Sequence, residues 1–510
     1  MSYLIGIDVG TTGCKSAIFN RKGEPIAVSS RDYDTSKPTP EAAEQSPQQW
    51  WGAVQETTND VLSEEEVEEN ELAGIGICGQ MHSAALLDSS MEVVRPSITW
   101  MDQRSVEAVE TLKSDIGDGK LRSITANFPT TTYTLPHLLW LKKNDKEAFA
   151  EIRHILLPKD YIKFKLTGEL STDYSDASGT FLLDYSSREW SKELLNYLGW
   201  SEKYLPSLGQ STEVIGEVTD QANRKTGLPS GTPVVAGSAD QTAGAVGMGS
   251  IKENQVTSLI GTAGVLSANS RTPRPDPEER LMCWAHAVPG LWQNLGVMQT
   301  AGATLRWFRE NLGEKDREGG PDSDRASYDR YNEAARSVQA GSKGLVFLPY
   351  LEGERTPHWD SNARGMFFGV TTEHQKKHFI RAIMEGVGYS LRDSAEIMEE
   401  LGIDISKIRV TGGGYRSDIW RQIVADITEK KIQYSTVKEG SAFGAALLSG
   451  IGSGVYSDFE EAVEVTVTSK EPTVPNENNR KVYRELHDIY QRLYGQTKEL
   501  YQDLSRVDFS

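Results

Sequence analysis

The chain has 510 residues, of which 38% are hydrophobic and 25% charged, a composition that predicts two or three globular domains and excludes a disordered or fibrous protein. Its 73 acidic and 54 basic residues leave a formal net charge of −19, which disfavours nucleic acid or an anionic membrane as a partner. The widely spaced Cys14, Cys78 and Cys283 favour reduced thiols and a cytoplasmic protein. We also expect no secretion signal and no membrane span, because no apolar run approaches about 18 residues.

The first predicted elements are three strands, over residues 3–9, 14–19 and 24–33, that pair as an antiparallel meander. The turn between the first two, "GTTG" at residues 10–13, is preceded by Asp8. Glycine turns expose backbone N–H groups and threonine adds hydroxyl donors, so this turn suits a phosphate oxygen. An ordinary hairpin can have the same composition, so one copy of the pattern decides nothing.

A helix is predicted to open at Ser46-Pro47, and the acidic segment 63–71 after it to be a solvated helix end or loop. The apolar segment 72–78 is predicted to be a buried strand that carries Gln-Met-His at residues 80–82. A histidine in such a place is often structural and a methionine is often core filler, so both readings stay open here.

A second buried strand is predicted over residues 231–240, ending in Asp240. The segment 241–250 that follows is rich in alanine and glycine. It is predicted either to be a helix that packs closely on another element or to be backbone that a ligand approaches. A carboxylate at a strand end can deprotonate or orient a hydroxyl, and it can also cap the next helix.

The opening pattern returns at residues 257–268, where apolar residues flank "GTAG". Gly10 and Gly261 are 251 positions apart, so the two copies sit near the start of each half of the chain. This spacing predicts two related domains that face one another. The chain contains no P-loop motif, and a strand follows the first turn where a dinucleotide fold requires a helix.

Later predicted elements are a long helix over about residues 373–400, a strand over 408–411 that leads into a glycine turn, and a packing helix in the last 30 residues. The histidines of this chain show no spacing with cysteines or acids that is typical of a metal site, so we expect no bound transition metal. Those considered are His154, His286, His374, His378 and His487.

Several segments, in order, carry a resemblance to a known family. They are GIDVGTTGCKSAIF, GICGQMHSAALLD, ITWMDQR, LLPKDYIKFKLTGELSTDYSDASGT, AGSADQTAGAVG, SLIGTAGV, LPYLEGERTPHWDSNARGMFFG, TGGGYRSDIWRQIVADI and EGSAFGAALL. The set resembles the FGGY family of carbohydrate kinases, most closely its xylulokinases, over nearly all of residues 3–450. This resemblance implies an α/β protein of two ribonuclease-H-like (actin-like ATPase) domains, residues 1–250 and 251–510, with a cleft between them.

The resemblance also implies roles for single residues. Asp240 would be the catalytic base, and Asp8 would hold Mg²⁺ beside the phosphates, although it could also simply form the turn. The residues that would bind ATP are Thr11, Thr12, Gly13, Lys15, Gly261, Thr262, Gly302, Gly413, Gly414 and Asp418. Those that would bind the sugar are Met81, His82, Trp100, Asp102, Arg104, Asp240 and Gln241. Lys15 could instead be a surface lysine, and Asp102 with Arg104 a structural pair.

The sequence departs from the family pattern near the expected sugar pocket. Ser83 stands where xylulokinases usually have glycine, and Met101 where asparagine is common. His137 occupies the place of a usual lysine. Ser83 and Met101 flank the expected sugar pocket, so these two departures bear on which sugar is bound more than on which reaction is catalysed.

We therefore expect an ATP- and Mg²⁺-dependent kinase that phosphorylates the terminal hydroxyl of a ketopentose, D-xylulose first. Ribulose, gluconate or a deoxy sugar are alternative substrates. A nucleotide-regulated binding protein of the actin or chaperone type is a more distant alternative. The sequence is compatible with a homodimer but does not determine the oligomeric state.

Overall fold

The computed structural model describes residues 2–64, 71–313, 321–437 and 439–507. Residues 65–70 of the predicted acidic loop therefore lie outside the described residues. Within the described ranges we find no helix whose length and apolarity would let it cross a bilayer.

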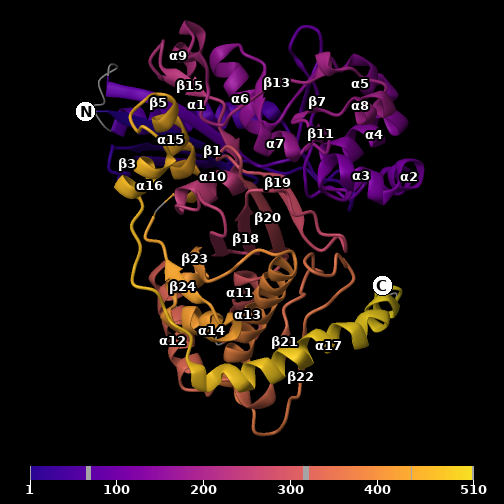
Figure 1. Ribbon diagram of the computed structural model, residues 1–510, viewed down its shortest axis with the longest axis vertical. Helices are drawn as coiled ribbons and strands as arrows, with labels where there is room; N and C mark the ends of the chain where they lie inside the picture. Colours follow the sequence, from indigo (N-terminus) through magenta and orange to yellow (C-terminus); the bar gives the residue numbers. More distant parts are fainter. Residues whose placement is uncertain (1, 65–70, 314–320, 438, 508–510) are drawn as a thin grey trace.

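Two mixed β-sheets form the centre of the molecule, one in each lobe (Figure 1). The first sheet has the order β14 (Val214–Glu217), β15 (Pro233–Val235), β5 (Leu72–Gly79), β1 (Tyr3–Val9), β2 (Gly13–Phe19) and β3 (Pro25–Asp32), and β16 (Ser238–Ala239) also pairs with β5. The second has the order β19 (Met282–Ala285), β20 (Trp292–Met298), β18 (Gly264–Ser270), β17 (Val256–Ile260), β23 (Lys407–Thr411) and β24 (Lys431–Tyr434).

The two sheets repeat one topology. In the first, β1 pairs antiparallel with β2 and parallel with β5. In the second, β17 pairs antiparallel with β18 and parallel with β23. The repeated turn in the sequence predicted this relation, since each copy joins the two antiparallel strands at the centre of its sheet.

Helices cover both sheets. Those of the first half are α1 (Pro47–Glu64), α2 (Val106–Ile116), α3 (Asp118–Thr125), α4 (Thr134–Asn144), α5 (Lys146–Glu151), α6 (Pro158–Thr167), α7 (Tyr174–Ser178), α8 (Lys192–Leu198), α9 (Asp220–Thr226) and α10 (Asp240–Gly247). Those of the second half are α11 (Gly302–Asn311), α12 (Pro321–Arg336), α13 (Lys376–Glu400), α14 (Asp418–Thr428), α15 (Gly440–Gly452), α16 (Phe459–Thr466) and α17 (Arg480–Ser505).

Short strands form small additional sheets at the edges of the lobes. They pair β4 (Glu44–Gln45) with β8 (Ser97–Ile98), β6 (Ala85–Leu87) with β7 (Val93–Arg95) and β9 (His154–Leu156), β10 (Ser171–Asp173) with β13 (Ser207–Gly209), β11 (Leu183–Asp184) with β12 (Glu189–Trp190), and β21 (Val346–Leu348) with β22 (Met366–Phe368).

Helix α15 belongs to the second half of the sequence but lies on the sheet of the first half (Figure 1). A Cβ atom on Gly6 of β1 would lie 1.8 Å from the carbonyl oxygen of Ala442, and one on Gly76 of β5 would lie 1.8 Å from that of Ala445. Only glycine fits such a backbone contact. The division of the chain at residues 250 and 251 stays a prediction, and residues 440–452 pack across it.

The alanine- and glycine-rich segment 241–250 forms α10, which packs against α15. A Cβ atom on Gly444 would lie 1.8 Å from the carbonyl oxygen of Ala243. The small residues are therefore explained by close helix packing, which was one of the two readings of this segment. Its preceding strand is shorter than predicted, because the chain bends at Gly237, where φ is 73°, between β15 and β16.

The predicted C-terminal helix is α17, which contributes to the core of the second lobe. Tyr483 and Tyr490 are buried there against α13, while Leu500 is 62% exposed. The long predicted helix before it, α13, begins at Lys376, three residues later than the expected residue 373.

We expect Gly6→Ala to destabilise the protein, because the new methyl group would overlap the α15 backbone, and overpacking of this kind costs about 3 kcal/mol or more. The matched control is Gly52→Ala in α1, where a Cβ meets nothing within 4 Å and alanine stabilises a helix by about 0.5 to 1 kcal/mol. Urea unfolding of the two variants measures both effects. An unchanged midpoint for Gly6→Ala would contradict the packing of α15 on β1.

Candidate active site

The two predicted catalytic carboxylates lie on either side of one strand. Asp8 in β1 is in register with Cys78 of β5, and Ser238 of β16 is in register with the same Cys78 on the other side. Asp240 follows β16 directly as the first residue of α10. Parallel strands present their carboxyl ends at one edge of a sheet, so this topology brings both side chains together.

Burial raises the pKa of both carboxylates. Burial raises the pKa of Asp8 to about 6, against the opposing effects of a hydrogen bond from Cys78 and the charge of Lys15. Burial and the negative charge of Asp8 raise the pKa of Asp240 to about 7. Asp240 can therefore take up or release a proton near neutral pH.

Asp8 also offers a free oxygen. Its Oδ1 is buried and has no hydrogen-bond partner among the described residues. An unpaired carboxylate oxygen is the kind of ligand that Mg²⁺ binds, directly or through water. The residues present at this position thus fit a magnesium ion.

The first glycine-threonine turn is held by side chains behind it. Trp100 donates its indole N–H to Thr11 Oγ1 at 2.9 Å, and Gln45 donates to the Thr11 carbonyl at 2.7 Å. Thr12 is exposed, which leaves its hydroxyl accessible to a ligand. A Cβ atom on Gly13 would lie 2.6 Å from the carbonyl oxygen of Arg31, so glycine is needed there for close packing.

Lys15 does not point freely into solvent. Its ammonium group pairs with Glu439 at 2.9 Å, just before α15. Both side chains are partly exposed, so the pair contributes little stability but joins the two halves of the chain next to Asp8.

The second turn is shorter than the first and is held by α11. The last paired residues are Val9 and Cys14 around the first turn but Ile260 and Gly264 around the second. The two turns are therefore related but not identical, and the second leaves one residue fewer outside the ladder.

Gly302 lies directly against this second turn. Its N–H donates to the Gly261 carbonyl at 2.8 Å, and a Cβ atom on it would lie 2.3 Å from that oxygen. Arg306 donates to Thr262 Oγ1 at 3.2 Å. Gly302 thus permits close packing of α11 on the turn, and its N–H is already used.

The glycine turn after β23 packs on the end of β17. A Cβ atom on Gly414 would lie 2.2 Å from the Ile260 side chain, whereas one on Gly413 would meet nothing within 4 Å. Gly413 therefore borders open space beside the second turn, which suits a ligand. Asp418, in the first turn of α14, is engaged with Arg336 at 2.7 Å, and this contact lowers its pKa.

The Met81–His82 pair lies in a cluster of buried aromatic side chains. Met81 and His82 are 4% and 5% exposed, and His82 has a left-handed φ of 73°, an unusual conformation for a residue that is not glycine. The His82 ring packs against Tyr133 and Trp284, with centroids 5.1 and 5.7 Å away. This aromatic cluster is thus built from both halves of the chain.

The contacts of His82 determine the tautomer and the charge of its ring. Its Nδ1 lies 2.6 Å from the carbonyl oxygen of Gly179, which can only accept, so Nδ1 carries the proton. Burial lowers the pKa of His82 to about 3. The ring is therefore neutral at physiological pH, and Nε2 is an acceptor that suits a sugar hydroxyl.

Asp102 and Arg104 form the structural pair that was the alternative to sugar binding. Asp102 is 0% exposed and accepts from the Ala43 N–H at 2.7 Å and from Arg104 at 2.8 Å. Arg104 also donates to Glu44 at 2.7 Å. The pair holds the segment that carries Trp100. Gln241 follows Asp240 in the first turn of α10 and is partly exposed.

Arg355, which the sequence analysis did not single out, lies against Trp100. Its guanidinium lies 4.9 Å from the centre of the Trp100 ring, and it forms no hydrogen bond or ion pair with any described residue. Burial lowers the pKa of Arg355 to about 10, which still leaves it charged at neutral pH. The segment around it, LPYLEGERTPHWD, was distinctive, but one arginine within it gave no local signal.

Comparison of the sequence with models of known protein families identifies the family of the chain. Residues 3–247 match the N-terminal domain, and residues 256–453 the C-terminal domain, of the FGGY family of carbohydrate kinases. The chain belongs to this family.

Individual relatives agree with this result. Xylulose kinase of Bacillus subtilis (strain 168) is 34% identical over 98% of this chain and 98% of its own length. The crystal structure of ligand-bound xylulose kinase from Lactobacillus acidophilus has a TM-score of 0.91 at 29% identity, covering 99% of this chain and 100% of that one. A gluconate kinase structure from the same species also has a TM-score of 0.91 at 29% identity, with 99% of both chains covered.

These comparisons confirm the predicted fold class and enzyme class. The protein is a two-domain FGGY carbohydrate kinase of the actin-like ATPase type, and it is a phosphotransferase. Kinases of this family generally use ATP with Mg²⁺.

Two of the departures from the family pattern have structural explanations in this carbohydrate kinase. Ser83 is 0% exposed, and its hydroxyl accepts a hydrogen bond from the backbone N–H of Trp100 at 3.2 Å. Ser83 therefore helps to hold the Trp100 backbone in place. His137 Nε2 lies 2.7 Å from the Thr131 carbonyl, and burial lowers the pKa of His137 to about 4. Both side chains are engaged within the first lobe. Nothing in the structure explains Met101.

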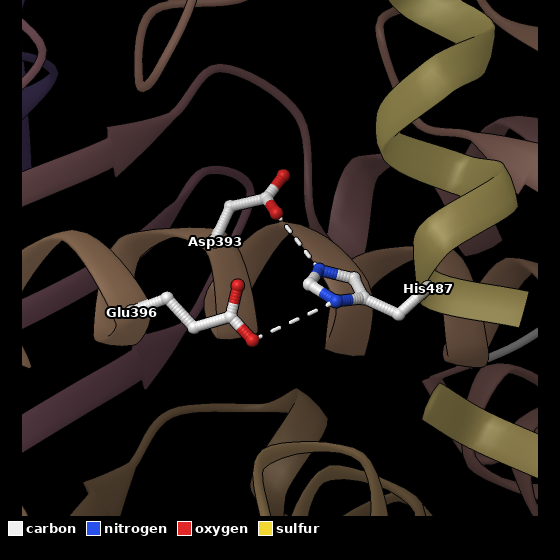
Figure 2. A group of neighbouring side chains, drawn as sticks. All are labelled: Asp393, Glu396 and His487. Atoms are coloured by element: carbon white, nitrogen blue, oxygen red, sulfur yellow. Dashed lines mark hydrogen bonds and ion pairs between the residues drawn. The ribbon is translucent and has the colours of Figure 1, made fainter. Parts of the chain in front are cut away.

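One histidine of the kinase does group with acids, which its sequence spacing did not indicate. His487 of α17 reaches between Asp393 and Glu396 of α13 (Figure 2), with its Nε2 2.8 Å from Asp393 Oδ1. Gln491 donates to the same Asp393 oxygen at 2.8 Å, and Arg392 donates to Glu396 at 2.7 Å. Because donors already serve both carboxylates, the cluster fits a clamp between two helices rather than a metal site.

We expect His82 to keep its proton on Nδ1 down to about pH 5, where an unperturbed histidine is charged. Spectra of ¹⁵N-histidine-labelled protein report the tautomer of each of the 8 histidines, and a His82→Asn variant identifies the signal. A His82 resonance that moves to the charged form above pH 5 would contradict the burial and the Gly179 contact.

Proposed function

We propose that this kinase transfers the γ-phosphoryl group of ATP to the terminal hydroxyl of a ketopentose, with D-xylulose as the preferred sugar. The observation that carries the proposal is the pair of partly buried carboxylates, Asp8 and Asp240, with raised pKa values, together with the neutral His82 ring that packs against Tyr133 and Trp284. Xylulose kinase is the name both of the Bacillus subtilis relative and of the ligand-bound Lactobacillus acidophilus structure, which supports xylulose as the substrate.

Asp240 is the proposed base. Its pKa of about 7 allows it to accept the proton of the attacking hydroxyl as the new oxygen–phosphorus bond forms and the bond to ADP breaks. His82 Nε2 accepts a hydrogen bond from another sugar hydroxyl and thereby orients the substrate. The Trp100 and Trp284 rings provide apolar faces for the carbon skeleton.

The nucleotide lies, in this proposal, between the two glycine-threonine turns. Thr12 and its turn face the phosphates from the first half, and the open space beside Gly413 receives the adenosine side. Asp8, through its free Oδ1, would hold Mg²⁺, which supplies charge neutralisation on the phosphate oxygens. Asp418 and Lys15 stay predicted contacts, since both are engaged with partner side chains.

Gluconate is a second candidate substrate. The unpaired Arg355 guanidinium at the Trp100 face suits a carboxylate as well as a carbonyl or hydroxyl oxygen. One structure of comparable similarity is a gluconate kinase. The sugar is therefore the part of the proposal that needs a direct assay.

We expect ADP formation to depend on added sugar and to be fastest with D-xylulose in a panel of pentuloses, polyols and aldonates. Asp240→Ala should lower kcat by about 10² to 10⁴, the usual range for a general base, while the affinity for a non-hydrolysable ATP analogue stays unchanged. A coupled ADP assay and calorimetry measure the two quantities.

The matched control is Asp220→Ala, which removes the first carboxylate of α9, the same helical position on an exposed helix. It should leave kcat unchanged. Sugar-independent turnover, or an Asp240→Ala variant with full kcat, would contradict the proposed reaction.

Arg355→Met should raise the sugar KM by about 10-fold to 100-fold, because a hydrogen bond from a charged donor contributes about 1.5 to 3 kcal/mol. The ATP KM should not change. The exposed Arg364 lies in the same segment, and Arg364→Met is the control. A larger loss for gluconate than for xylulose would assign a carboxylate contact to Arg355, and an unchanged sugar KM would remove Arg355 from the pocket.

A further inference from the structure

A cluster of buried charges lies beside the segment that carries Asp240. It contains Lys159, Asp160 and Lys163 of α6, and Asp173 and Asp176 at the start of α7, all with 0% side-chain exposure. We call these five residues the buried charge cluster. Its centre is the Lys159 ammonium group, which lies 2.5 Å from Asp160, 3.1 Å from Asp173 and 3.2 Å from Asp176.

Stability alone does not account for this cluster. Removing charges from water is costly, and well-packed apolar residues of similar size usually stabilise a protein at least as well as a buried ion pair. The charges are also not needed to bind the substrates, because they are fully enclosed. A cluster of this kind suits a role that apolar packing cannot fill, such as fixing polar backbone groups in one position.

Two hydrogen bonds connect the cluster to the backbone between β15 and α10. Lys163 donates to the Ala236 carbonyl at 2.9 Å. At the other end of the segment, the Ala239 N–H donates to Ser175 Oγ at 2.9 Å, and Ser175 in turn donates to Asp173 at 2.5 Å. The residue after Ala239 is Asp240 itself.

Backbone hydrogen bonds hold the start of the segment 236–239, where the N–H groups of Ala236 and Gly237 donate to the carbonyls of Glu213 and Ser211 at 2.8 and 3.0 Å, and the bond from Ala239 to Ser175 holds its end. The segment consists of Ala-Gly-Ser-Ala, and it bends at Gly237, where φ is 73° and a Cβ would lie 1.9 Å from the Ile77 carbonyl oxygen. Small residues permit the close approach to β5 but do not lock the chain in one place. The side chains of Lys163 and Ser175 bracket the bend.

We infer that the buried charge cluster, acting through Ser175 and Lys163, positions the backbone that carries Asp240 and so sets the catalytic carboxylate against the sugar hydroxyl. Ser175 and Lys163 are positioning residues, since neither touches substrate. This inference rests on the proposed role of Asp240. A misplacement of about 1 Å at a reacting group can lower a rate about 10²-fold, so the effect should appear in kcat.

The chain offers a matched pair of variants for the test. Ser175 and Ser211 are both buried, and both donate a hydrogen bond to Asp173 Oδ2, at 2.5 and 2.9 Å. Only the Ser175 hydroxyl also accepts from the Ala239 N–H. Ser175→Ala and Ser211→Ala therefore remove similar bonds to the same carboxylate, but only the first also removes a side-chain bond to the Ala239 N–H. The Ser211 carbonyl, which accepts from the Gly237 N–H at 3.0 Å, is retained in both variants.

We expect Ser175→Ala to lower kcat by about 10-fold to 100-fold with little change in the ATP KM, while Ser211→Ala stays within about twofold of the parent enzyme. The urea midpoints of the two variants should fall by similar amounts. Lys163→Met, which removes the bond to the Ala236 carbonyl, should also lower kcat. Because both serines contribute to the fold in the same way, a difference in kcat at equal stability reports positioning.

Other outcomes overturn the inference. Equal kcat values for the two serine variants would show that the cluster has only a structural role, provided that Asp240→Ala is inactive in the same assay. If Asp240→Ala were active, the proposed function itself would fail, so the two failures are distinguishable.

Discussion

The fold of this kinase depends on one steric constraint, the contact of helix α15 with the sheet of the other half of the chain. Gly6 in β1 and Gly76 in β5 face α15 carbonyl oxygens at distances that exclude any Cβ atom, and Gly444 of α15 faces α10 in the same way. Asp8 is the last residue but one of β1, the Met81–His82 pair follows shortly after the end of β5 at Gly79, and α10 begins with Asp240. The contact of α15 thus places the active-site ends of three elements.

The buried charges of the molecule fall into two groups with opposite consequences. In the buried charge cluster, burial opposes the charged form of Lys159, but the nearby carboxylates outweigh it and raise its pKa. No ammonium or guanidinium group pairs directly with Asp8 or Asp240 among the described residues; burial raises the pKa of Asp8 against the charge of Lys15, and burial with the charge of Asp8 raises the pKa of Asp240. The effect of pairing is not uniform within the cluster, because burial lowers the pKa of Lys163 to about 8 and raises that of Asp176.

The sequence predicted the features that depend on local pattern. The paired strands, the two turns and the position of Asp240 after a buried strand follow from alternation and glycine content over short windows. The contact of α15 with β1 could not be predicted in this way, because it joins residues more than 400 positions apart. Nor could the cluster of Lys159 and Lys163, since lysines in a helix usually indicate a solvated face, or the free guanidinium of Arg355.

The proposed sugar site combines side chains from both halves of the chain. His82 and Tyr133 come from the first half, while Trp284 and Arg355 come from the second, and the Trp284 indole donates to the Tyr133 hydroxyl at 3.3 Å. Separation of the two halves would remove both Trp284 and Arg355 from His82 and Tyr133. The same separation would part the glycine-threonine turns, because each belongs to a different sheet. If the proposed sugar and phosphate contacts are correct, both depend on one arrangement of the lobes, and a bound sugar would favour the geometry that excludes water from phosphoryl transfer.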